Sequence, residues 1–175
     1  KPKFAVLNQW VAMTNSPSRN LVIDTEGVVR VMVPRAPIAP PNVAVGSGSG
    51  LTGAYTYKTS FVVLGSDGSL YMESPLSPAS QSVTAANQDF ALTRIELSND
   101  SISARRLYRT LAGGTVYYQI GDLDGNTQTA LNNNTADASV TLLPAMPSVL
   151  ASPPGTIDGT WLKNTPIPAD RARYG

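Results

Sequence analysis

The sequence predicts an all-β protein built around an antiparallel two-sheet sandwich. Short runs rich in β-branched and aromatic residues recur at close spacing, which is typical of strands. Fourteen Gly and fourteen Pro separate these runs and supply turns and strand ends. Helical periodicity is nearly absent: only residues 4–13 could form a short turn of helix, and Pro17 follows closely.

Composition narrows the function classes. The chain has 175 residues, which is enough for one sandwich of about 100 residues with material left at both ends. A net charge of +1 gives no field that would attract nucleic acid or anionic lipid, so neither is expected as a partner. No apolar run is long enough for a membrane helix. Cysteine and histidine are both absent, which removes the commonest nucleophile, general base and metal ligands. We therefore expect no enzyme, no cofactor and no metal.

Residues 1–41 are predicted to form an N-terminal arm. Residues 21–24 and 28–33 are strand-like and flank Thr25-Glu26-Gly27, a loop whose Gly can take the left-handed position of a bulged hairpin. The hairpin strands are apolar on both faces, so we expect one face to be covered by a partner or by the rest of the chain. The prolines of residues 34–41 then impose an extended linker.

Residues 42–143 are predicted to be the sandwich domain. Tyr55, Tyr57 and Phe61 alternate with polar residues and define the core face of one strand. Pro75 and Pro78 should stop sheet growth after it. Further strands or turns are expected in the following segments: 43–45, 81–84, 91–97, 104–110, 116–120 and 127–131 as strands, and 65–68, 112–114 and 122–126 as turns. Residues 144–175 form a Pro-rich tail that can be ordered only against something else.

Two blocks of the domain resemble parts of a fibronectin type III domain, an immunoglobulin-like sandwich. Residues 54–84, from Ala-Tyr-Thr-Tyr-Lys to Ser-Val-Thr, resemble the late F and G strands of that family. Residues 104–129, from Ala-Arg-Arg-Leu-Tyr-Arg-Thr to Thr-Gln-Thr, resemble its middle strands C, C′ and E. Because the late strands come first here, the resemblance implies a circularly permuted module. Together with Asn-Thr-Ala-Asp-Ala at 134–138, this pattern is similar to modules of tailed-bacteriophage virion proteins.

Three candidate sites are weighed against structural explanations. Residues 122–126 place oxygen ligands at alternate positions, as at the beginning of a calcium loop, but they lack the later Gly and the closing Glu of such a loop. A solvent-facing turn is therefore favoured for this segment. A turn is also favoured over a ligand role for Asn132-Asn133-Asn134. The basic cluster of Arg105, Arg106 and Arg109 beside Tyr108 could suit single-stranded nucleic acid. Alternation splits its charge between two faces, so exposed strand charges with some ion pairs are favoured.

Five residues are the candidate interaction residues. Trp10 and Trp161 are large aromatics outside the sandwich, where such residues often anchor interfaces. The others are Tyr174 at the end of the tail and Val29 and Val31 in the hairpin.

The resemblance and the apolar extensions imply a structural component of a tailed-phage virion, in the neck, the tail or associated with the head. Its expected partners are other copies of itself and neighbouring virion proteins. The alternative is a carbohydrate-binding or adhesion module of a bacterial surface or extracellular protein, which would hold a host surface glycan on exposed tyrosines such as Tyr117 and Tyr118. An enzyme is the weakest hypothesis, because no nucleophile elbow, metal box or phosphate loop is present.

Overall fold

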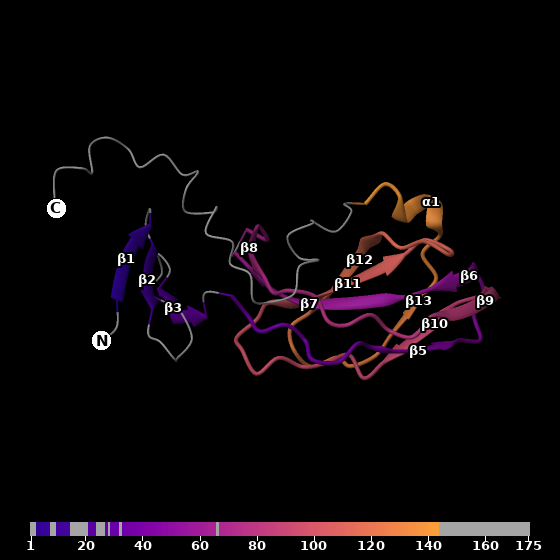
Figure 1. The fold of residues 1–175 in the computed structure, drawn as a ribbon, viewed down its shortest axis with the longest axis horizontal. Helices are drawn as coiled ribbons and strands as arrows, with labels where there is room; N and C mark the ends of the chain where they lie inside the picture. The colour runs from indigo at the N-terminus through magenta and orange to yellow at the C-terminus, as the bar shows by residue number, and fades with distance from the viewer. Residues whose placement is uncertain are drawn as a thin grey trace.

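The computed structural model describes residues 3–7, 10–14, 21–23, 27, 29–31, 33–65 and 67–143 (Figure 1). In these residues the chain is almost entirely antiparallel β-sheet, with one short helix, α1 (Asp137–Val140). The all-β prediction is therefore confirmed. Residues 144–175, including Trp161 and Tyr174, lie outside the described part.

The larger part of the protein is a sandwich-like body made of three sheets. One sheet has the strand order β12-β11-β7-β8, and the layer opposite it consists of the sheets β13-β10-β5 and β6-β9. The strands are β5 (Asn42–Val45), β6 (Leu51–Tyr55), β7 (Tyr57–Leu64), β8 (Leu70–Glu73), β9 (Val83–Gln88), β10 (Phe90–Thr93), β11 (Ala104–Thr110), β12 (Tyr117–Asp124) and β13 (Leu131–Asn133).

A single stretch of chain passes from one layer to the other. β6 pairs with β9, whereas β7, which begins two residues after β6 ends, pairs with β11 and β8. Thr56 lies at the crossing, and its backbone N–H donates to Thr110 Oγ1 while its carbonyl accepts from Thr110 N. Tyr55 and Tyr57 therefore enter the same core from two different sheets.

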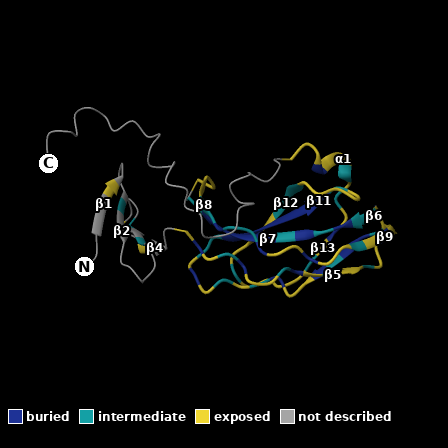
Figure 2. Cartoon of the chain, viewed as in Figure 1, coloured by how far each residue is buried: buried dark blue, intermediate teal, exposed yellow. Residues whose placement is uncertain are grey.

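The core lies between the two layers. Tyr55, Tyr57 and Phe90 are at most 2% exposed, and the ring of Phe90 meets both tyrosines edge-on, at centroid distances of 5.4 Å and 5.8 Å. The prediction that Tyr55 and Tyr57 point into the core is confirmed, and Phe61 is also buried. Figure 2 shows the buried residues concentrated on β7 and β11, which are the two central strands of their sheet.

Three serines continue the sheet where prolines prevent an ordinary strand. Ser74, Ser77 and Ser80 are buried and recur every three residues beside β7. The backbone N–H of each donates to a β7 carbonyl, and the hydroxyl of each accepts from the N–H of that same β7 residue. The β7 partners of the three serines are Phe61, Thr59 and Tyr57, in that order. Pro75 and Pro78, which have no N–H, fall between the serines, as expected for an edge segment.

Ser77→Ala is expected to lower the free energy of unfolding by about 1–3 kcal/mol, because the N–H of Thr59 would stay buried without its acceptor. Urea unfolding of the variant and of Ser82→Ala, which removes an exposed hydroxyl, measures the difference. Equal losses in both variants would contradict this role of the serine.

Several predicted elements differ from the structure. Residues 4–13 contain two strands and no helix, because their apolar residues satisfy a two-residue repeat once they are paired. Residues 94–97 and 127–130 are not strands; Ile95 N–H donates to Thr129 O instead. Residues 122–124 belong to β12, and only Gly125 and Asn126 form the turn.

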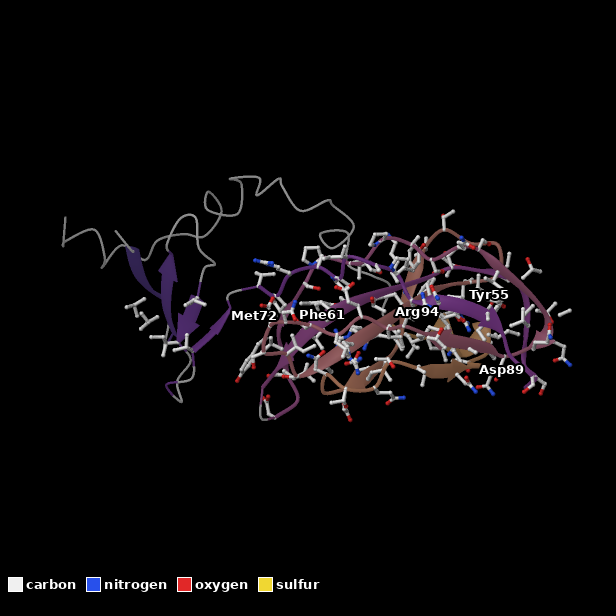
Figure 3. All side chains as sticks on the ribbon, turned by 90° about the horizontal axis from the view of Figure 1, so that it is seen from below. Tyr55, Phe61, Met72, Asp89 and Arg94 are labelled. Atoms are coloured by element: carbon white, nitrogen blue, oxygen red, sulfur yellow. The ribbon has the colours of Figure 1, made fainter. Side chains whose placement is uncertain are left out.

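The N-terminal residues form a separate four-stranded meander, called here the N-terminal sheet. It has the order β1-β2-β3-β4, with β1 (Lys3–Leu7), β2 (Trp10–Thr14), β3 (Leu21–Ile23) and β4 (Val29–Val31). The pairing of β3 with β4 is the predicted hairpin, and Gly27 has a φ of 79°, in the left-handed region expected for it. Figures 1 and 3 show this sheet beside the sandwich-like body, joined to it by residues 33–41.

Candidate interaction surface

One face of the N-terminal sheet carries only apolar residues. Directly paired positions share a face of an antiparallel sheet, and so do positions two apart on one strand. The register joins Val6 to Val11, Val11 to Ile23 and Ile23 to Val29. With the positions two residues away on each strand, the apolar face comprises Phe4, Val6, Val11, Met13, Leu21, Ile23, Val29 and Val31.

This apolar face is open to solvent at both edges of the sheet. Val6 on β1 and Val29 on β4 are each 56% exposed. Val11 and Ile23, on the two inner strands, are partly exposed, as expected where neighbouring strands shield each other within a single layer. No strand of the described sandwich-like body packs extensively on β1–β4. The exposed valines in one contiguous apolar row make this face the candidate interaction surface.

The predicted interaction residues divide between the two faces. Val29 and Val31 belong to the apolar face, whereas Trp10 is paired with Leu7 and its position falls on the other face. That other face also carries the positions of Lys3, Thr14 and Arg30, so its chemistry is mixed. The two faces are therefore not equivalent, although the sequence predicted apolar residues on both.

The segment between the N-terminal sheet and the sandwich-like body is held by two carboxylates. Glu96 Oε2 accepts hydrogen bonds from the backbone N–H groups of Ile38 and Ala39, at 2.7 and 2.8 Å. Asp100 Oδ2 accepts from Arg35 N at 3.0 Å. Pro34, Pro37 and Pro41 of the same segment are buried. This segment was predicted as an extended linker, and the structure fastens it to the body.

The basic cluster on β11 is buried, which corrects the prediction of exposed strand charges. Arg109 is fully buried; its Nη2 donates to Asp137 Oδ1 at 2.8 Å and its Nη1 to Asn133 Oδ1 at 2.9 Å. Its guanidinium also lies over the ring of Tyr55, 4.8 Å from the centroid. Desolvation raises the pKa of Tyr57, whose hydroxyl donates to Asn133, and the charge of Arg109 opposes part of that rise. Arg109 therefore acts as a core residue.

Arg106 is held on the other side of the same strand. Its Nε and Nη2 donate to the two oxygens of Asp122, at 2.8 and 2.9 Å, and its Nη1 donates to Glu73 at 3.2 Å. Glu73 also accepts from the hydroxyls of Tyr108 and Ser60. The hydrogen bonds and charge of Asp122 raise the pKa of Arg106, whereas burial and Glu73 raise the pKa of Tyr108. The predicted division of charge between two faces is thus present.

Arg105 has carbonyl partners only. Its Nε and Nη1 donate to the carbonyls of Gly125 and Gln128, and burial lowers its pKa. With all three guanidiniums enclosed, β11 offers no basic surface that could track a nucleic-acid backbone.

In the calcium-like segment 122–126, the side chains of Asp122 and Asn126 bind other protein groups, whereas Asp124 is exposed. Asp122 binds Arg106, and the amide of Asn126 both accepts from and donates to the backbone of Ser98. Asn133, predicted in a turn, lies in β13 and is buried. Among the described residues, no group of three acidic, cysteine or histidine side chains could hold a metal ion.

The tyrosines predicted to hold a glycan are only partly exposed. Tyr117 shares a hydrogen bond of 2.9 Å with Thr56, and Lys58 Nζ lies 4.8 Å from the centroid of its ring. Tyr118, next to it on β12, is also partly buried. Glycan binding by these residues stays a prediction.

Sequence reasoning did not identify the partners of Arg106 and Arg109, among them Glu73, Asn133 and Asp137. Asp137 belongs to the Asn-Thr-Ala-Asp-Ala motif at 134–138, which had been noted only as part of a resemblance. A buried charge is usually paired or hydrogen-bonded, so the joint presence of this motif and the Arg-rich strand was the available signal.

No family model, no curated protein and no solved structure matches this chain. In the described ranges, no helix is long and apolar enough to cross a membrane.

Proposed function

We propose that this chain is a non-enzymatic structural component of a tailed-phage virion, in the neck, the tail or associated with the head. It assembles through its N-terminal sheet and displays the sandwich-like body. The observation that carries the assembly role is the apolar face, with Val6 and Val29 exposed on two strands. Covering these exposed apolar side chains would remove them from water, which is favourable.

The order of three strands supports the fibronectin type III-like part of the proposal. In immunoglobulin-like sandwiches, strands C, F and G share a sheet, and C′ joins the same sheet in some of them. If β7 is the F-like strand and β11 and β12 are the C- and C′-like strands, the observed order β12-β11-β7 is the order C′-C-F, whereas the G-like residues 82–84 fall at β9, which pairs with β6 in a different sheet. In the chain, F and G precede C and C′, as a permuted module requires. The virion setting itself rests on the resemblance of the motifs.

The anchored linker also favours an assembly role. Glu96 and Asp100 fasten residues 35–39 to the body, so the N-terminal sheet is presented at a defined end of the sandwich-like body. A presented apolar sheet suits contact with neighbouring subunits better than catalysis, for which the described residues supply no matching group.

The test is the mass of the full chain in solution. Native mass spectrometry and light scattering over a range of concentrations should show assemblies larger than the 18.4 kDa monomer. A monomer at every concentration would contradict the assembly role. Electron microscopy of virions produced in the presence of a tagged copy of the chain would then test the virion setting. Virions without the label would count against it.

A further inference from the structure

We infer that the occupant of the apolar face is the N-terminal sheet of a second copy of this chain, with the two apolar faces turned inward and the sheet edges joined. This inference rests on the proposed assembly function and names its partner. A contact between two identical sheets gives a closed, symmetric assembly, as in most soluble homo-oligomers.

The chemistry of the face selects an apolar partner. None of its eight positions holds a charged or polar residue, so it offers nothing to a charged peptide, a nucleic acid or a sugar. An identical face is complementary to it by construction. The opposite face is mixed, since the positions of Lys3 and Arg30 lie on it together with those of Leu7 and Trp10.

The edges of the sheet point to the same partner. β1 pairs only with β2 and β4 only with β3 within the described residues, so the outer edge of each has no strand partner there. Free edges are templates for another strand, and closure removes them. Two four-stranded meanders joined at both edges make eight strands, the number at which side chains just fill a closed barrel.

The area of the apolar face is too small for a stable interface by itself, so the sheet edges must contribute to the contact as well. Two strands of five residues and two of three, about 4.8 Å apart and with about 3.3 Å per residue, give a face of roughly 250 Å². A standard stable interface needs about 800 Å² from each partner. Flat stacking alone falls short of this. Joining the edges adds backbone hydrogen bonds and encloses the side chains.

Val6→Asp and Val29→Asp test the inference in the full-length protein. Each places a carboxylate on the apolar face at a position where the free chain tolerates it, since both valines are 56% exposed. We expect native mass spectrometry to show the mass of the assembly halved, or a dimer reduced to monomer. Val116→Asp makes the same change at a valine that is 53% exposed, outside the N-terminal sheet, and should leave the mass unchanged. Circular dichroism should show folded protein in all three variants.

A cross-link provides a second readout that does not depend on disrupting the contact. The protein has no cysteine, so Val6→Cys combined with Val29→Cys introduces the only thiols. These positions lie on the two outer strands, about 14 Å apart within one sheet, which is too far for an internal disulfide. Joined edges bring Val6 or Val29 of one copy beside the partner's edge strand, so mild oxidation should give a covalent dimer. Val6→Cys with Val116→Cys should give far less.

The outcomes separate the inference from the function on which it rests. An assembly that persists unchanged in both aspartate variants, without a disulfide dimer, overturns the paired sheets and leaves the assembly role intact. A wild-type chain that is monomeric throughout overturns the assembly role itself. Loss of assembly in Val116→Asp as well would place the contact elsewhere and also overturn the inference.

Discussion

Asp137→Ala is expected to lower the free energy of unfolding by about 2–3 kcal/mol, less than the cost of breaking a fully buried ion pair, because the Asp137 side chain is 32% exposed. Arg109 is fully buried and would lose its carboxylate partner, 2.8 Å away. Asp137 Oδ2 also accepts from the Tyr55 hydroxyl and from Ala112 N. The substitution therefore leaves a buried cation without its carboxylate, whereas the Tyr55 hydroxyl keeps Thr52 O as an acceptor and the exposed Ala112 N–H can reach water.

Urea unfolding at neutral pH measures this loss, with Asp124→Ala as the matched control. Asp124 is an exposed carboxylate on β12, so its removal should change stability by no more than about 0.5 kcal/mol. Arg109→Met combined with Asp137→Ala should recover part of the loss, because it removes the buried charge together with its partner. A loss below about 1 kcal/mol for Asp137→Ala would show that solvent replaces the carboxylate and would refute the structural role assigned to it.

Phe90→Ala is expected to lower the free energy of unfolding by about 3–5 kcal/mol, because it removes a fully buried aromatic ring from the core between the two layers. Phe90 has no exposed surface, and its ring touches Tyr55 and Tyr57 on either side of the point where the chain changes sheet. A cavity there would remove the packing that orients both tyrosines.

Thermal and urea unfolding of Phe90→Ala can be compared with Leu97→Ala, which removes a side chain that is 44% exposed. Phe90→Leu should lie between the two, since it keeps part of the buried volume. Similar stabilities for the alanine variants at positions 90 and 97 would mean that the core does not depend on this ring.

Prediction from the sequence succeeded where local pattern and burial agree. The alternation around Tyr55 and Tyr57 indicated their burial, and residues 104–110 were predicted as the strand that became β11. It failed for residues 4–13, because a short apolar run fits a helix and a strand equally well until its pairing partner is known. The long-range registers of the N-terminal sheet resolve that ambiguity.

The sequence by itself determined the all-β class, the turn at Gly27 and the absence of histidine and cysteine chemistry, because local residue preferences and composition decide these. Only the tertiary structure decided that Arg105 and Arg109 are buried, because their carbonyl and carboxylate partners come from residues about 20 to 30 positions away. It also decided that Val6, Val11, Ile23 and Val29 form one face. Strand register, which joins residues of neighbouring strands, sets which side chains share a surface.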